Sequence, residues 1–159
     1  MKEVKMRRYQ NLLTVSGLGV IAFGLWSVLK TFLLLVLRND MREQMFEEMP
    51  NELLVKVIVY VILAFLVLTD FGIRLFVGLS ARAEGFGKKK GYAYIVFAIL
   101  IALSSLGSLL LLIFGSNPDE SLLELTVSTI VEVTNLVVMI ELLVAAFTVK
   151  KLKKEISEV

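Results

Sequence analysis

Long apolar runs separated by short polar segments form the dominant pattern of this chain. A helix needs about 20 apolar residues to cross the roughly 30 Å of hydrocarbon in a bilayer, and four runs reach that length. The predicted spans cover residues 12–37, 53–79, 92–114 and 122–149. No internal repeat and no linker long enough to separate domains interrupts them. The pattern therefore predicts an all-α, integral membrane four-helix bundle in which residues 1–159 form one transmembrane domain.

Basic residues are distributed unequally among the segments that flank the spans. Twelve of them precede the first span, separate the second from the third, or follow the fourth: Lys2, Lys5, Arg7, Arg8, Arg82, Lys88, Lys89, Lys90, Lys150, Lys151, Lys153 and Lys154. The other two connecting segments are acidic and contain Arg38 and Arg42 as their two basic residues. By the positive-inside rule, both termini are predicted to be cytoplasmic in a multi-pass protein of the cell membrane.

The overall composition excludes several classes of protein. Hydrophobic residues make up 57% of the chain, and 17 Lys and Arg against 15 Asp and Glu leave a net charge of +2, which argues against disorder and against nucleic-acid binding. The chain has no Cys and no His, so disulfides, thiol chemistry, His-ligated haem and most zinc sites are excluded. We therefore expect no metal and no cofactor.

Two motifs with chemical meaning are approached but not completed. Residues 85–91 resemble a phosphate-binding loop, but Arg82 and Lys89 replace the required Gly and hydroxyl, and Lys90 replaces the last Gly of a dinucleotide motif. We interpret this segment as a basic turn that sets topology and contacts anionic lipid. The Asp-Phe-Gly sequence at 70–72 has no second catalytic aspartate beside it, so no enzyme is predicted.

Ionisable residues inside the predicted spans are the candidates for function. There are seven of them: Lys30, Lys56, Asp70, Arg74, Glu124, Glu132 and Glu141. Each costs about 2.5–3.5 kcal/mol at the centre of a span, so we expect these side chains to face the bundle interior, a cavity or one another. Polar residues share one helical face on three spans, which predicts three polar seams. They are Ser16, Ser27 and Lys30 on the first span, Lys56, Tyr60, Asp70 and Arg74 on the second, and Glu124, Ser128, Glu132 and Asn135 on the fourth.

Depth along the helix axes suggests which charges pair. Lys30, Lys56 and Glu124 are predicted to lie in the outer third of the spans, and Asp70 and Glu132 nearest the midplane. Pairing by depth links the two lysines with Glu124 and Glu132. Three cations meet four carboxylates inside the spans, so one acid is left without a formal partner. Trp26 lies one turn before Lys30, and we expect it to pack in the core rather than to line a cation site.

Arg74 has two predicted acidic neighbours. Asp70 lies four residues earlier on the same helix, and Glu141 lies across the bundle. Glu141 points nearly opposite to Glu132 on the fourth span, so it alternatively faces a second subunit or lies nearer to the membrane interface.

Small residues predict where helices approach each other closely. The first span contains them on more than one face, at Gly17, Gly19, Ala22, Gly24 and Ser27, and the third contains a stripe at Ala98, Ala102 and Ser105. Close contacts are therefore expected within the bundle and between subunits.

Two interpretations of the intramembrane charges stay open. They serve only to fix helix register, or they form a path for a solute. The preferred functional hypothesis is a homo-oligomer in the lipid bilayer that moves or gates a small ion or solute through the charged seams. The alternative is an accessory or regulatory subunit that does not transport and docks another membrane protein as its partner.

Overall fold

Four helices make up almost all of the described part of the chain. The structure, a computed structural model, describes residues 2–37, 53–115 and 122–157. Its helices are α1 (Lys2–Leu37), α3 (Leu53–Gly85), α4 (Ala93–Phe114) and α5 (Leu122–Ser157), and no strand occurs among the described residues. All four are long and apolar enough to cross a membrane, which confirms the predicted all-helical fold with four candidate spans.

Three of the helices extend beyond the apolar runs from which they were predicted. α1 begins at Lys2 instead of residue 12, α3 continues from residue 79 to Gly85, and α5 continues from residue 149 to Ser157. The added segments contain no Pro, and Lys, Arg, Glu and Leu are good helix formers. Hydropathy indicates where a helix leaves the hydrocarbon of the membrane. The helix propensity of the residues that follow allows the helix to continue beyond that point.

A glycine ends α3. Gly87 has a φ of +90°, in the left-handed region that side chains disfavour. Its N–H donates to the carbonyl of Glu84 at 3.0 Å, and the N–H of Lys88 donates to the carbonyl of Ala83 at 3.0 Å. These two bonds form a Schellman motif, which turns the chain sharply towards α4.

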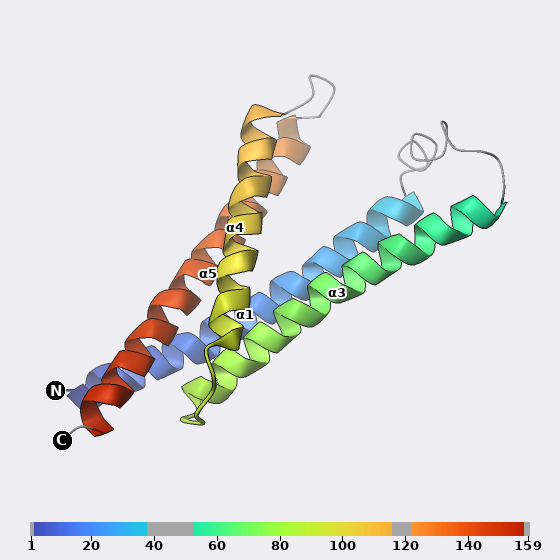
Figure 1. Ribbon diagram of the computed structural model, residues 1–159. Coiled ribbons are helices and arrows are strands. Elements are labelled where there is room, and N and C mark those ends of the chain that lie inside the picture. Colours follow the sequence, from blue (N-terminus) through green and yellow to red (C-terminus); the bar gives the residue numbers. More distant parts are fainter. Residues whose placement is uncertain (1, 38–52, 116–121, 158–159) are drawn as a thin grey trace.

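The helices form two pairs that diverge like the arms of a V (Figure 1). α1 lies beside α3, and α4 lies beside α5. At one end, here named the packed end, α1 begins, α5 ends and the turn between α3 and α4 is found. The pairs separate towards the opposite end, here named the splayed end. The four-helix packing expected from the sequence is therefore limited to the packed end.

The buried core shows the same restriction. Its largest fully buried apolar side chains are Tyr94, Leu13, Met139, Leu142, Val20, Val77 and Val149. Val20 and Met139 lie at the middle of α1 and α5, and the others belong to the halves of the helices nearest to the packed end. In α4, Ala98 and Ser105 are buried, which confirms that the predicted small-residue stripe is a packing face.

α1 and α3 cross closely where two glycines meet. A Cβ atom added to Gly78 would lie 2.5 Å from the carbonyl oxygen of Gly17, and one added to Gly17 would lie 2.8 Å from the carbonyl oxygen of Gly78. Real Cβ atoms do not approach backbone this closely, so both positions require glycine. On another side of α1, Gly19 lies against Val138 of α5. Gly17 and Gly19 thus serve contacts within one copy of the chain, whereas Ala22 is exposed.

We predict that Gly78→Ala lowers the free energy of unfolding by about 2 kcal/mol, because overpacking outweighs the better helix propensity of alanine. Gly72→Ala on the same helix is the matched control, since nothing lies within 4 Å of its added Cβ. Thermal unfolding in mild detergent measures both. Equal stability of the two variants would contradict the close contact of α1 with α3.

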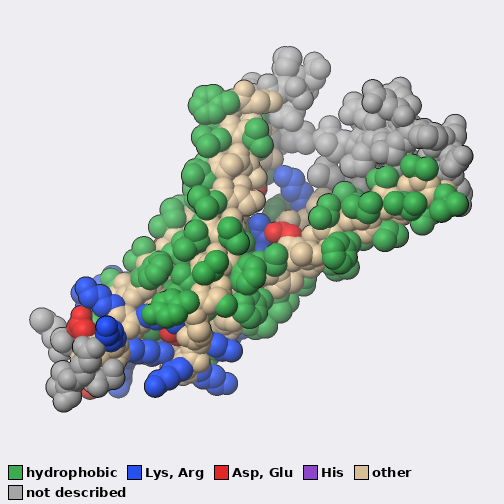
Figure 2. All heavy atoms as spheres, in the orientation of Figure 1, with side chains coloured by type: hydrophobic (Ala, Val, Ile, Leu, Met, Phe, Trp, Pro, Cys, Tyr) green, Lys and Arg blue, Asp and Glu red, His purple; other side chains and the backbone are tan. Residues whose placement is uncertain are grey.

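The surface is apolar along the arms and basic at the packed end (Figure 2). Large exposed apolar side chains occur on every helix, including Leu25, Phe65, Leu111 and Ile130. Lys and Arg side chains gather at the packed end, and a smaller group of charged side chains lies in the angle between the two pairs. Apolar arms of this kind suit contact with lipid chains.

Candidate binding site between the helix pairs

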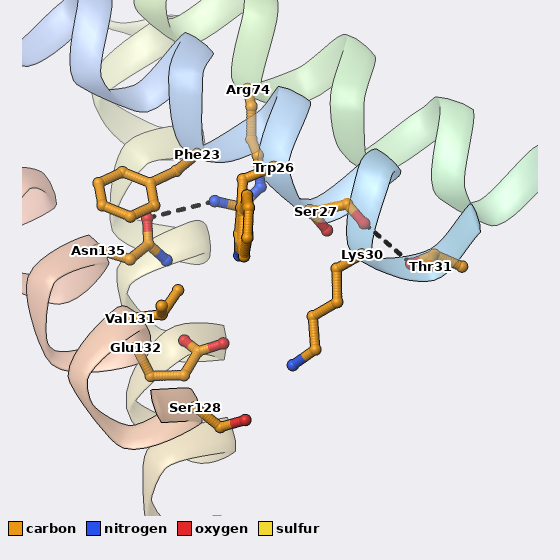
Figure 3. Close-up of a pocket in the computed structure, with 10 residues that line it drawn as sticks. All are labelled: Phe23, Trp26, Ser27, Lys30, Thr31, Arg74, Ser128, Val131, Glu132 and Asn135. Carbon is orange, nitrogen blue, oxygen red and sulfur yellow. Dashed lines mark hydrogen bonds between the residues drawn. The ribbon is translucent and has the colours of Figure 1, made fainter. Parts of the chain in front are cut away.

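A cavity of about 260 Å³ lies in the angle between the helix pairs. It is named here the charged cavity, and Figure 3 shows the residues that line it: Phe23, Trp26, Ser27, Lys30, Thr31, Arg74, Ser128, Val131, Glu132 and Asn135. They belong to α1, α3 and α5. The cavity begins where the buried core of the packed end stops.

Part of each predicted polar seam lines this cavity. Ser128, Glu132 and Asn135 contribute from α5, and Arg74 contributes from α3. From α1, Ser27 and Lys30 reach it. Three helices thus direct polar side chains into one space. This arrangement avoids the free-energy cost of exposing charged groups to lipid.

A chain of polar contacts closes the cavity on the side of the packed end. Arg74 Nε lies 2.9 Å from Asp70 Oδ2, which is the ion pair predicted from their spacing. The Nη1 atom of Arg74 donates to Asn135 Oδ1 at 3.4 Å, and Asn135 Nδ2 donates to Ser105 Oγ at 2.8 Å. Asn135 and Ser105 are buried. These contacts join α3, α5 and α4 on the side of the cavity nearest to the packed end.

A glycine of α1 makes room for the arginine. A Cβ atom added to Gly24 would lie 3.2 Å from both Cβ and Cδ of Arg74 and 3.3 Å from the ring of Phe71. Because Gly24 has no side chain, Arg74 passes between α1 and α3 and reaches α5. The small residue here has a local purpose that its spacing in the sequence did not reveal.

Lys30 and Glu132 face each other across the cavity without forming an ion pair. Both side chains point into the space, one from α1 and one from α5 (Figure 3). Among the described residues, no ion pair or hydrogen bond joins the two groups. The direct pairing suggested by their depth is thus absent here, because the helix pairs have already begun to diverge at this level.

Trp26 is not part of the core. It is 45% exposed and lines the charged cavity beside Lys30, so the expectation that it packs in the core was wrong. The same divergence explains the difference, since no helix of the other pair comes close enough to cover the indole. Its ring is available to a ligand in the cavity.

The remaining charged candidates do not join this site. Glu141 is exposed on α5, and the described polar partners of Arg74 are Asp70 and Asn135, so no pair between Arg74 and Glu141 forms within the described residues. Its exposure is compatible with the alternative in which Glu141 faces a second subunit. The side chains of Lys56 and Glu124 lie outside the described part of the chain.

A second charged cluster, which sequence reasoning missed, is found at the packed end. Glu84 of α3 is 1% exposed. The hydroxyl of Tyr94 donates to its Oε2 atom at 2.6 Å, and Lys150 Nζ and Lys153 Nζ lie 3.3 and 3.7 Å from its Oε1 atom. Lys150 Nζ also donates to the carbonyl of Lys90 at 2.8 Å. A buried carboxylate thus ties α3, α4 and α5 together.

The signal for this cluster is present in the sequence. Val77, Ala81 and Glu84 follow at spacings of four and three, so they share one helical face once α3 is continued past residue 79. In α5, Ala146, Lys150 and Lys153 follow the same spacing. The predicted spans end at residues 79 and 149, so Glu84, Lys150 and Lys153 were not among the predicted site residues.

Neither site is arranged for a metal ion. In the described segments, no group of three or more Asp and Glu side chains is close enough to coordinate one. The chemistry available in the charged cavity is ionic contact, hydrogen bonding from hydroxyls and stacking on an indole. Comparison with protein-family models, with curated proteins and with solved structures finds no match to this chain.

Proposed function

We propose that the protein binds a small polar solute in the charged cavity and, as a homo-oligomer, moves or gates that solute across a membrane. The observation that carries this proposal is the pair of opposite charges, Lys30 and Glu132, that face each other across the cavity without contact. Neither charge has a partner among the described residues, and two such charges inside a membrane span are costly unless a ligand or water satisfies them.

The chemistry of the lining favours a solute that carries both charges. Arg74 is already neutralised by Asp70, so it contributes little free charge. A carboxylate of the solute then lies towards Lys30 and its ammonium group towards Glu132. The indole of Trp26 offers a face to the cationic group. A zwitterion therefore fits this lining better than a single anion or cation.

Movement of the solute requires a change in how the two helix pairs pack. The cavity lies on the splayed side of the core, and the packed end closes the other side. With cytoplasmic termini, the cavity faces the outside of the cell. Rocking of one helix pair against the other would close the splayed end and open the packed end, so that the cavity faces each side of the membrane alternately. In the homo-oligomer, further copies of the chain would cover the apolar arms.

The orientation is tested by labelling introduced cysteines. The chain has no native Cys, so no background thiol interferes. Cysteine at Glu47 or Asp119 should react with an impermeant reagent on intact cells, and cysteine at Lys89 should react only after permeabilisation. Labelling in the opposite pattern would place the termini outside and reverse the direction in which the cavity opens.

The function is tested by uptake into vesicles reconstituted with the purified protein. The probes are labelled zwitterionic amino acids, with rubidium and chloride as ions of one charge. We expect Glu132→Gln to reduce uptake of the zwitterions at least tenfold, because one charge-assisted contact is lost. Expression and oligomeric state should stay close to those of wild type, since the amide keeps the shape of the carboxylate.

Glu141→Gln is the matched control for this variant. It makes the same chemical change on the same helix, at an exposed position outside the cavity. Equal loss of uptake in both variants would show that the cavity is not the site. Uptake of rubidium or chloride in preference to every zwitterion would show that the solute is a single ion.

A docking function is the second candidate, and the divergence of the helix pairs favours it. Each arm presents exposed apolar side chains over its length, which offers a large area for the helices of another membrane protein. Purification in mild detergent distinguishes the two functions. A transporter should be recovered as a defined homo-oligomer, and an accessory subunit should be recovered with a different polypeptide.

A further inference from the structure

An open pocket of about 540 Å³ lies at the packed end, apart from the charged cavity. It is bounded by the turn between α3 and α4 and by the last turns of α5. Five lysines line it beside one carboxylate: Lys89, Lys90, Lys150, Lys153, Lys154 and Glu84. It is named here the lysine pocket, and its lining is strongly cationic.

Buried contacts hold the wall of this pocket in place. Lys150 Nζ approaches Glu84 Oε1 at 3.3 Å and the carbonyls of Lys90 and Gly91 at 2.8 and 3.5 Å, so its three N–H groups are all directed to protein acceptors. It also lies 4.5 Å from the centre of the Tyr92 ring. Lys150 therefore fastens the turn to α5 and is a positioning residue.

The positive charge that remains available belongs to other lysines. Lys89 and Lys90 are exposed, and their ammonium groups make no hydrogen bond to any residue that the structure describes. Lys153 has longer contacts, 3.7 Å to Glu84 Oε1 and 3.4 Å to the carbonyl of Lys88. Since Glu84 is already satisfied by Tyr94 and Lys150, the pocket has an excess of cationic donors.

We propose that the lysine pocket binds a phosphate group, with Lys89, Lys90 and Lys153 as its ligands. Lysine ammonium groups are common phosphate ligands in proteins, and several converging on one group provide charge and N–H donors together. The phosphate is supplied by an anionic lipid headgroup or by a soluble phosphate. Exposed Phe86 and Tyr92 beside the pocket are typical of the membrane interface, where headgroups lie.

The test compares the full-length protein with a triple variant, Lys89→Gln, Lys90→Gln and Lys153→Gln, by native mass spectrometry in mild detergent. Phosphatidic acid and phosphatidylcholine are added at equal concentrations. Wild type should retain phosphatidic acid in preference. Each lysine near an anionic surface contributes a factor of about five to binding, so the triple variant should lose roughly a hundredfold.

The matched control removes three basic side chains elsewhere at the packed end, Lys5→Gln, Arg7→Gln and Arg8→Gln, which are exposed on α1. It should retain phosphatidic acid as wild type does. Equal retention by wild type and the triple variant overturns the proposal, and so does an equal loss in the control, which would indicate attraction by surface charge alone.

A second arm identifies the source of the phosphate. Millimolar inorganic phosphate is added to the complex of wild type with phosphatidic acid. Chloride at equal ionic strength is the control. If phosphate displaces the lipid and chloride does not, the pocket is a site for soluble phosphate. Retention of the lipid supports the headgroup as the ligand. Thermal unfolding of the triple variant without ligand should stay within a few degrees of wild type, since Glu84 keeps its shorter contacts with Tyr94 and Lys150. This measurement separates loss of binding from loss of fold.

Discussion

Glu84→Leu is expected to lower the free energy of unfolding by about 3–5 kcal/mol, because it leaves buried donors without their acceptor. The side chain of Glu84 is 2% exposed, and that of Lys150, which lies beside it, is 13% exposed. The hydroxyl of Tyr94 also donates to this carboxylate. With the carboxylate removed, the ammonium group of Lys150 stays largely buried without its acidic partner. Thermal unfolding in mild detergent should show a decrease in Tm on the order of 10 °C.

Two further variants make this prediction specific. Glu84→Gln keeps an acceptor for Tyr94 and removes the charge, so its loss of stability should be intermediate. Glu3→Leu removes an exposed carboxylate at the same end of the protein and should change Tm by little. If Glu84→Leu were as stable as Glu3→Leu, the carboxylate would not be the buried link between α3, α4 and α5.

The four helices were predictable from hydropathy because a span in lipid needs a long, uninterrupted apolar run. The ends of the helices were not, since hydropathy reports the solvent around a segment and not its backbone conformation. α3 ends at Gly85, six residues after the predicted end at Leu79, because Gly87 there adopts a left-handed conformation. The buried cluster at Glu84 lies within this extension.

The charged cavity was predictable in part. Helical periodicity placed Ser128, Glu132 and Asn135 on one face of the fourth span, and the structure directs that face into the cavity. Spacing of four residues also predicted the pair between Arg74 and Asp70. Both are properties of a single helix, which the sequence of that helix determines.

The distance between helices was not predictable from depth. Pairing by depth linked Lys30 with Glu124 and Glu132, but level along an axis does not determine how far apart two axes lie. The divergence of the helix pairs leaves these groups facing each other across open space and leaves Trp26 exposed. That divergence depends on contacts between helices, such as the crossing of Gly17 with Gly78, for which one sequence offers candidates but no geometry.

Lys30→Glu is expected to reduce binding of a zwitterionic solute by roughly a hundredfold, since a favourable charge-assisted contact of about 1.5–3 kcal/mol becomes a repulsive one. The variant places two carboxylates across the cavity from each other. Its Tm should change by only a few degrees, because Lys30 is exposed and forms no ion pair with Glu132 among the described residues. Uptake into vesicles and thermal unfolding are measured on the same preparation.

Exchange of the two charges then distinguishes a ligand site from a structural pair. In the double variant Lys30→Glu with Glu132→Lys, both charges are present in reversed positions, and a zwitterion can bind in the opposite orientation. Uptake should recover at least tenfold relative to Lys30→Glu alone, with Tm nearly constant through the series. If the single variant instead lost much of its stability and the exchange restored it, Lys30 and Glu132 would be a structural ion pair. The charged cavity would then have no unpaired charges to offer a solute, and the docking function would be favoured.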